Sequence, residues 1–100
     1  EDPPLLASAD LSTEDGCRLR YALGRSQYKL NKLALTVEGF GEAGKRCVSV
    51  APDYGARALY IGGTAQYRRG QYAASAEAFR LLGESYPQHS MADDGWLHGG

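Results

Sequence analysis

The chain lacks a strong net charge, a long apolar run and any compact catalytic motif. It has 11 basic and 12 acidic residues among 100, a formal net charge of −1, whereas a protein that binds duplex nucleic acid usually carries a strongly basic face. No stretch of about 18 apolar residues occurs, so no segment is expected to span a membrane. There is also no CxxC pair, no phosphate-binding loop and no Ser/His/Asp order typical of a catalytic triad. We therefore expect no cofactor, no nucleic-acid partner and no membrane span.

Strand patterning is scarce as well. The only β-leaning stretch, residues 47–51, is five residues long and lies between segments of helical spacing. The sequence therefore predicts an all-α fold.

Helix start and stop signals divide the chain into segments. Ser12 or Thr13 is placed to cap a first helix whose first turn carries acids, and Asn31 separates it from a second helix that fades by residue 47. Pro52 suits the entry of a third helix and Gly70 its end. A fourth helix starts near residue 73 and ends before Pro87, and Ser90 opens a capping box for a fifth. The residues at helical spacing in the four helices, in chain order, are Leu19, Leu23, Ser26 or Gln27 and Leu30; Leu33, Val37 and Phe40; Ala58, Leu59, Ile61, Ala65 and Tyr67; and Ala76, Phe79, Leu82 and Tyr86.

Three glycines recur at nearly equal intervals, each shortly after an aromatic or aliphatic residue. Gly24, Gly63 and Gly100 are separated by 39 and then 37 positions. A period in this range is typical of stacked helical hairpins.

Residues 59–87 carry the pattern Leu59-x2-Gly62-Gly63, Gly70-Gln71-Tyr72, Ser75-x3-Phe79 and Pro87. This pattern resembles the tetratricopeptide repeat, with Leu59 in place of its tryptophan and Ser75 in place of an alanine. Residues 20–47 resemble the repeat more weakly, since Arg20 occupies a slot for a large apolar residue, and Trp96 begins a third copy. The resemblance implies a short right-handed solenoid of about two and a half hairpins. Its expected parts are an extended lead-in (1–11), two hairpin repeats (12–50 and 51–89) and the first helix of a truncated third repeat (90–100).

The segment that joins the second and third copies is more specific. Residues 86–94, Tyr-Pro-Gln-His-Ser-Met-Ala-Asp-Asp, look like the linker of repeat proteins in the bacterial envelope. The α-superhelical arm of soluble lytic murein transglycosylases carries such hairpins, and its segments are similar to residues 18–25. The resemblance implies a non-catalytic scaffold or protein-interaction segment of a larger peptidoglycan-processing enzyme in the periplasm or envelope. The alternative is an envelope adaptor that serves outer-membrane assembly or cell division. The expected partners are other domains of the same protein, a protein or peptide, or peptidoglycan through the parent enzyme.

The two cysteines allow two interpretations. Cys17 opens the first expected hairpin and Cys47 closes it, and in an antiparallel hairpin the start of one helix lies near the end of its partner. The thiols form a disulfide if their Cα atoms come within about 7 Å, which would be consistent with an oxidising compartment. The alternative is two separate, half-buried thiols.

No residue is expected to be catalytic or to bind a metal. Glu84-Ser85 superficially resembles the pair that holds the catalytic acid of a transglycosylase, but it lies at the closing turn of a repeat helix. His89 and His98 are nine positions apart, whereas metal ligands on one helix usually lie three or four apart. Asp93 and Asp94, between them, fit the first turn of a helix.

The remaining candidate is an interaction surface. Residues 1–15 hold five acids and no base, whereas residues 16–37 hold five bases and no acid. In the tetratricopeptide family the first helix of each hairpin lines the concave face, which implies a groove with two rows of tyrosines and cations. The rows are Tyr21, Arg25, Tyr28, Lys29 and Lys32 in the first unit, and Tyr60, Thr64, Tyr67, Arg68 and Gln71 in the second. Such a groove would accept an acidic or extended partner or a neighbouring part of the same protein; the alternatives are packing between repeats and a solvated surface.

Overall fold

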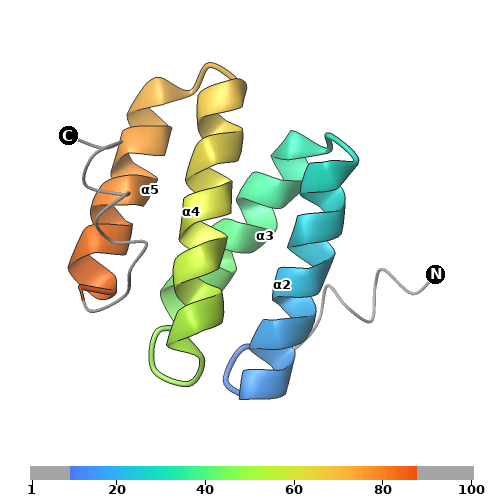
Figure 1. Cartoon of the computed structure of the whole chain (residues 1–100), viewed down its shortest axis with the longest axis vertical. Coiled ribbons are helices and arrows are strands. Elements are labelled where there is room, and N and C mark those ends of the chain that lie inside the picture. Colours follow the sequence, from blue (N-terminus) through green and yellow to red (C-terminus); the bar gives the residue numbers. More distant parts are fainter. Residues whose placement is uncertain (1–9, 88–100) are drawn as a thin grey trace.

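The computed structural model describes residues 10–87, which form an all-α domain of four helices (Figure 1). In chain order these are α2 (Glu14–Lys29), α3 (Leu33–Arg46), α4 (Pro52–Arg68) and α5 (Tyr72–Ser85). Between residues 10 and 87 no residue is in a strand. The prediction of an all-α fold is confirmed for this part of the chain. The expected fifth helix, from residue 90 onward, lies outside the described residues.

The helix boundaries follow from residues that cap or interrupt helices. The Thr13 side chain accepts a hydrogen bond from the Gly16 backbone N–H and so satisfies one of the free donors of the first turn of α2. Pro52 occupies the start of α4, where its missing N–H costs nothing. The two short turns each contain a residue with left-handed backbone: Asn31 has φ 63° and Gly70 has φ 80°. Both turns reverse the chain within three residues, which makes the helices antiparallel neighbours.

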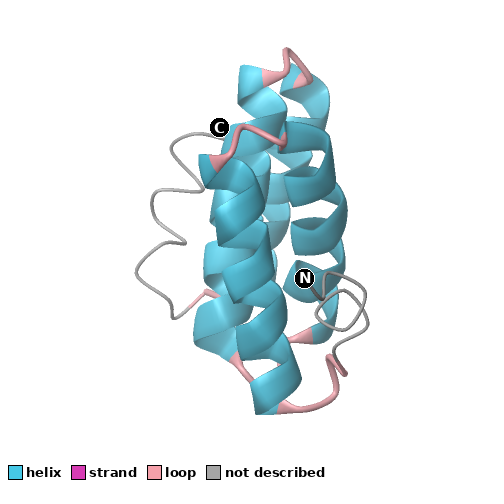
Figure 2. Ribbon diagram, turned by 90° about the vertical axis from the view of Figure 1, so that its right-hand side faces the viewer, coloured by secondary structure: helices cyan, strands magenta, loops and turns pink. Residues whose placement is uncertain are grey.

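Adjacent helices pack against one another, and α4 is central. It contacts α3, α5 and α2, while α3 also packs against α2. Figure 1 shows α2, α4 and α5 side by side with α3 behind α2 and α4, and Figure 2 shows the same bundle from the side.

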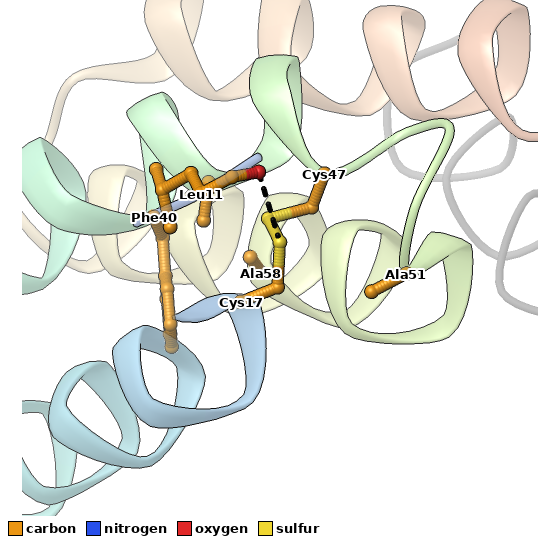
Figure 3. Packing of buried hydrophobic residues seen from close by; sticks show 7 residues of the cluster. Leu11, Cys17, Phe40, Cys47, Ala51 and Ala58 are labelled. Carbon is orange, nitrogen blue, oxygen red and sulfur yellow. Dashed lines mark hydrogen bonds between the residues drawn. A yellow bond between two sulfur atoms is a disulfide. The ribbon is translucent and has the colours of Figure 1, made fainter. Parts of the chain in front are cut away.

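Two apolar clusters hold these helices together. The first joins the lead-in segment, α2, α3 and α4 around the two cysteines, as Figure 3 shows; its buried members are Leu11, Cys17, Phe40, Ala43, Cys47, Ala51 and Ala58. The second joins α4 and α5 through Ala56, Leu59, Phe79, Leu82 and Tyr86. Many of these side chains are small, so the helices approach closely.

Gly24 shows how close the approach is. A Cβ atom built on Gly24 would lie 2.2 Å from Cε1 and 2.4 Å from Cζ of Phe40. The Phe40 ring is fully buried and stacks on Tyr21 with ring centroids 5.7 Å apart. The ring therefore occupies the space that any larger residue at position 24 would need.

The expected helix faces are correct in part. Phe40, Leu59, Phe79, Leu82 and Tyr86 are buried as predicted. Three other positions at this spacing are exposed: Leu19 is 39% exposed, Leu30 67% and Tyr67 61%. The buried residues of α2 are Gly16, Cys17 and Gly24 instead: Gly16 lies against the Asp10 backbone, Cys17 is bonded to Cys47, and Gly24 lies against Phe40 of α3.

Candidate interaction surfaces

The first predicted row lies on α2 and its turn, and its tyrosines are held by other rings. Tyr21 is half-buried between Phe40 and Tyr54, with ring centroids 5.7 and 5.4 Å away. The Arg25 guanidinium carbon lies 5.9 Å from the centroid of the Tyr21 ring, within range of a cation–π interaction. Lys29 and Lys32 are exposed. In this row Tyr21 therefore packs into the domain, whereas Lys29 and Lys32, near the α2–α3 turn, face solvent.

The second predicted row, on α4, is divided in the same way. Tyr60 is half-buried and meets Phe79 edge to face at 5.6 Å, and the Thr64 hydroxyl donates to the Tyr60 carbonyl oxygen over 2.9 Å. Tyr67 is exposed and contacts Tyr72 of α5, with ring centroids 4.9 Å apart. Gln71 is exposed and accepts a hydrogen bond from Arg69 at 3.5 Å.

The rows meet at Arg68. Its guanidinium carbon lies 5.4 Å from the centroid of the Tyr28 ring, and Nη2 donates to Asn31 Oδ1 over 3.3 Å. One arginine of the α4 end thus binds the last turn of α2 and the turn that follows it. Of the ten predicted residues, Tyr28 and Arg68 are the two that an observed contact joins across the rows.

A third arginine lies further down α4. Arg57 donates from Nε to Asp53 Oδ2 over 2.9 Å. Hydrogen bonding to the Tyr21 side chain first, and the Asp53 carboxylate second, raise the pKa of Arg57 above its ordinary value. Arg57 is therefore a further cation beside the Tyr21 side chain, although the prediction did not include it.

A hollow of about 240 Å³ lies among α3, α4 and α5, away from the predicted rows. Gly62 and Gly63 of α4 contribute to its lining, and so does Gly41 of α3, where an added Cβ atom would meet nothing within 4 Å. Gln66 also lines the hollow, and its buried Oε1 has no hydrogen-bond partner in the structure. None of the ten predicted residues borders it.

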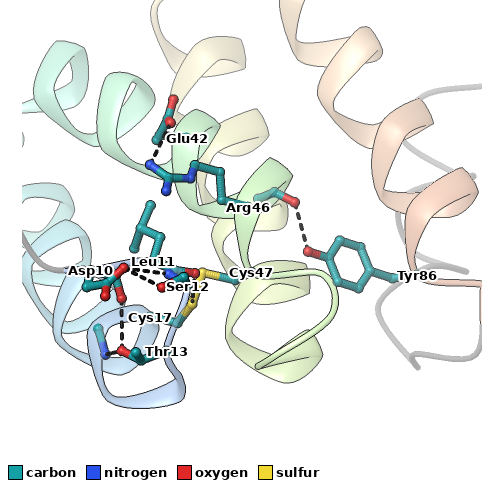
Figure 4. The surroundings of a disulfide bond; sticks show 11 residues. Asp10, Leu11, Ser12, Thr13, Cys17, Glu42, Arg46, Cys47 and Tyr86 are labelled. Carbon is teal, nitrogen blue, oxygen red and sulfur yellow. Dashed lines mark hydrogen bonds and ion pairs between the residues drawn. A yellow bond between two sulfur atoms is a disulfide. The ribbon is translucent and has the colours of Figure 1, made fainter.

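The structure joins Cys17 and Cys47 by a disulfide, with Cα atoms 6.1 Å apart. Figure 4 shows the bond between the start of α2 and the end of α3. The Cys17 sulfur also lies 3.4 Å from the Leu11 carbonyl oxygen, a contact made without a thiol hydrogen. Both cysteines are fully buried. The bond is compatible with an oxidising compartment.

Tyr86, just after α5, is linked to the same end of α3 as the disulfide. Its hydroxyl donates to the Gly44 carbonyl oxygen over 2.8 Å, so the end of α5 is tied to α3 (Figure 4). Burial raises the pKa of Tyr86 to about 12, because the charged phenolate loses hydration there.

Of the residues considered for chemistry, the structure describes Glu84 and Ser85. Glu84 is exposed and accepts from Arg80 Nη1 at 2.6 Å, and Arg80 also pairs with Glu77. The described residues contain no group of three His, Cys, Asp or Glu side chains able to hold a metal ion. His89, Asp93, Asp94 and His98 lie outside the described residues.

Comparison with protein-family models, with curated proteins and with solved structures finds no match for this chain. Between residues 10 and 87, none of the helices has the length and apolar character needed to cross a bilayer.

Proposed function

We propose that the chain is a non-catalytic segment of a helical-repeat protein, in which two tetratricopeptide-like hairpins form an interaction scaffold. The observation that carries this proposal is a set of matching environments 39 positions apart. Gly24 lies against Phe40 and Gly63 against Phe79, and each phenylalanine follows its glycine by 16 positions.

Further contacts support the same offset. Tyr21 packs on Phe40, and Tyr60 packs on Phe79. The left-handed residue of the first turn is Asn31, and that of the second is Gly70, again 39 positions on. These contacts lie within each hairpin, and the two hairpins meet where Gly62 faces Phe40 and Gly44 faces Leu59. Further hairpins with the same contacts would stack and expose a continuous surface.

The surface that fits a partner is formed by the tyrosine and cation rows. Near the two short turns the rows expose Lys29, Lys32, Tyr67 and Arg68. Cations with aromatic rings suit an acidic, extended peptide. The chemistry favours binding over catalysis, since Glu84 is an exposed member of an ion pair at a helix end.

The test compares two charge reversals of equal size. Arg25→Glu with Lys29→Glu changes the predicted rows, and Arg18→Glu with Lys45→Glu changes exposed cations elsewhere on α2 and α3. Partners cross-linked to the chain in envelope extracts should be lost with the first pair and retained with the second. Equal retention by both variants would refute binding through these rows.

The resemblance of residues 86–94 extends the proposal to the parent protein, a lytic transglycosylase in which this segment helps to shape the approach of peptidoglycan. Full-length protein should then cleave purified peptidoglycan non-hydrolytically, and Glu84→Gln should leave that activity unchanged. A full-length protein without such activity would favour the envelope adaptor instead.

A further inference from the structure

The end of the domain at which both short turns lie combines exposed apolar side chains with cations. Figure 1 shows the α2–α3 turn and the α4–α5 turn at the same end of the bundle, and Figure 2 agrees. We call this end the turn-end surface and define it by Lys29, Leu30, Lys32, Tyr67, Arg68, Arg69 and Tyr72. All seven residues are exposed.

The apolar part of this surface is unusually prominent. Leu30 is 67% exposed and Tyr67 and Tyr72 are each 61% exposed; the next large apolar side chain between residues 10 and 87, Leu35, is 46% exposed. The Tyr67 and Tyr72 rings pack edge to face, so they form one protruding aromatic pair. The three most exposed large apolar side chains of the described part of the chain thus lie in or beside the two turns.

Among the described residues, the charges in the two turns and the adjoining helix ends are of one sign. No Asp or Glu occurs between residues 16 and 37 or between residues 54 and 76. The five ion pairs found among residues 10–87 use Arg18, Arg46, Arg57 and Arg80, none of which belongs to the turn-end surface. Arg68 and Arg69 bond instead to the neutral side chains of Asn31 and Gln71. The positive charge of the turn-end surface therefore remains available to an anionic partner.

We propose that the turn-end surface docks on the anionic face of a lipid bilayer. Leu30 and Tyr72 would enter the interface, where apolar and tyrosine side chains are favoured, while Lys32 and Arg69 would pair with headgroup phosphates. Lys29, Lys32, Tyr67 and Arg68 also belong to the predicted rows, whereas Leu30, Arg69 and Tyr72 belong to neither row. A bilayer surface would engage the exposed Leu30 and Tyr72 side chains, which a peptide lying along the rows would not. This inference goes beyond the proposed function and depends neither on the repeat nor on the identity of a protein partner.

The experiment is co-sedimentation of the 100-residue chain with vesicles of phosphatidylcholine alone and of an equimolar mixture with phosphatidylglycerol. The wild type should sediment with the anionic vesicles and remain in solution with the neutral ones. Lys32→Gln with Arg69→Gln should lower partitioning about fivefold for each charge removed. Leu30→Ser with Tyr72→Ser should lower it by about tenfold or more, because two apolar side chains no longer enter the interface.

Two matched control variants separate this surface from general effects. Arg18→Gln with Lys45→Gln removes the same charge away from the turns, and Val48→Ser with Val50→Ser removes exposed apolar groups from the opposite end. Both should partition like the wild type, and circular dichroism should show that all variants are folded. Absence of binding to anionic vesicles, or equal losses in the controls, would overturn the proposal. Full binding by Leu30→Ser with Tyr72→Ser, together with displacement by polyglutamate, would identify an acidic-peptide site and also overturn it.

Discussion

Replacing Gly24 with alanine tests the packing on which the fold depends. Alanine in a helix interior gains about 1 kcal/mol over glycine. Against this, the added Cβ would lie between 2.2 and 2.8 Å from three carbons of the Phe40 ring, and that ring is fully buried between α2 and its neighbours. Overpacking of a core costs about 1–3 kcal/mol and occasionally more, and contacts this short belong at the upper end of that range. With the gain of about 1 kcal/mol subtracted, Gly24→Ala should lower the free energy of unfolding by about 2 kcal/mol.

Two other glycines make the prediction sharper. A Cβ at Gly41 would meet nothing within 4 Å, so Gly41→Ala should stabilise the protein by about 0.5–1 kcal/mol. A Cβ at Gly63 would lie 3.1 Å from the Phe79 ring and 3.3 Å from Ala78, so Gly63→Ala should have a small net effect. Urea denaturation measures all three through the midpoint at constant slope. If Gly24→Ala were as stable as the wild type, or Gly41→Ala the less stable of the two, the packing argument would be refuted.

The disulfide and the buried tyrosine supply the remaining predictions. Replacing Cys17 and Cys47 with alanine opens a link across 30 positions and should cost about 3.6 kcal/mol in the chain-entropy model, measured as a lower urea midpoint; an unchanged midpoint would contradict this. Tyr86→Phe leaves the Gly44 carbonyl without its donor and should cost about 1–3 kcal/mol, measured by thermal unfolding. Because burial raises the pKa of Tyr86 from 10.0 to about 12, the stability that its neutral form contributes is complete below pH 10 and is lost as the pH rises through 12. The stability difference between wild type and Tyr86→Phe should therefore shrink over this range, and a constant difference would count against it.

Local signals were sufficient to predict the helices. A cap at Thr13, a proline at position 52 and a glycine at position 70 act within one or two turns, and the observed helix ends follow them. These residues work through backbone donors and dihedral angles that do not depend on the rest of the fold.

Burial was harder to predict, because it depends on which face of a helix meets its neighbours. Leucines at helical spacing favoured a buried Leu19 and Leu30, but α2 packs against α3 through Gly24. Where a glycine lets two helices approach closely, its backbone contacts the opposing ring. A count of apolar side chains along the helix does not identify such a face, because glycine has no side chain.

Contacts between distant segments were out of reach in the same way. Arg68 meets Asn31 across 37 positions, and Tyr86 meets Gly44 across 42. The periodicity of one helix carries no information about the rotation of a helix packed against it. The sequence could therefore not show which residues the tyrosines and cations of the two rows contact.

The first and the last described helix are fastened to α3 by bonds of very different strength. A covalent link fastens the beginning of α2 to the end of α3, whereas α5 is fastened at its end by one phenol–carbonyl bond from Tyr86. Under a stretching force, or in amide hydrogen exchange, α5 should separate from the domain first, while the disulfide-linked helices α2 and α3 stay together. The order of disassembly is thus written into the positions of two sulfur atoms and one hydroxyl group.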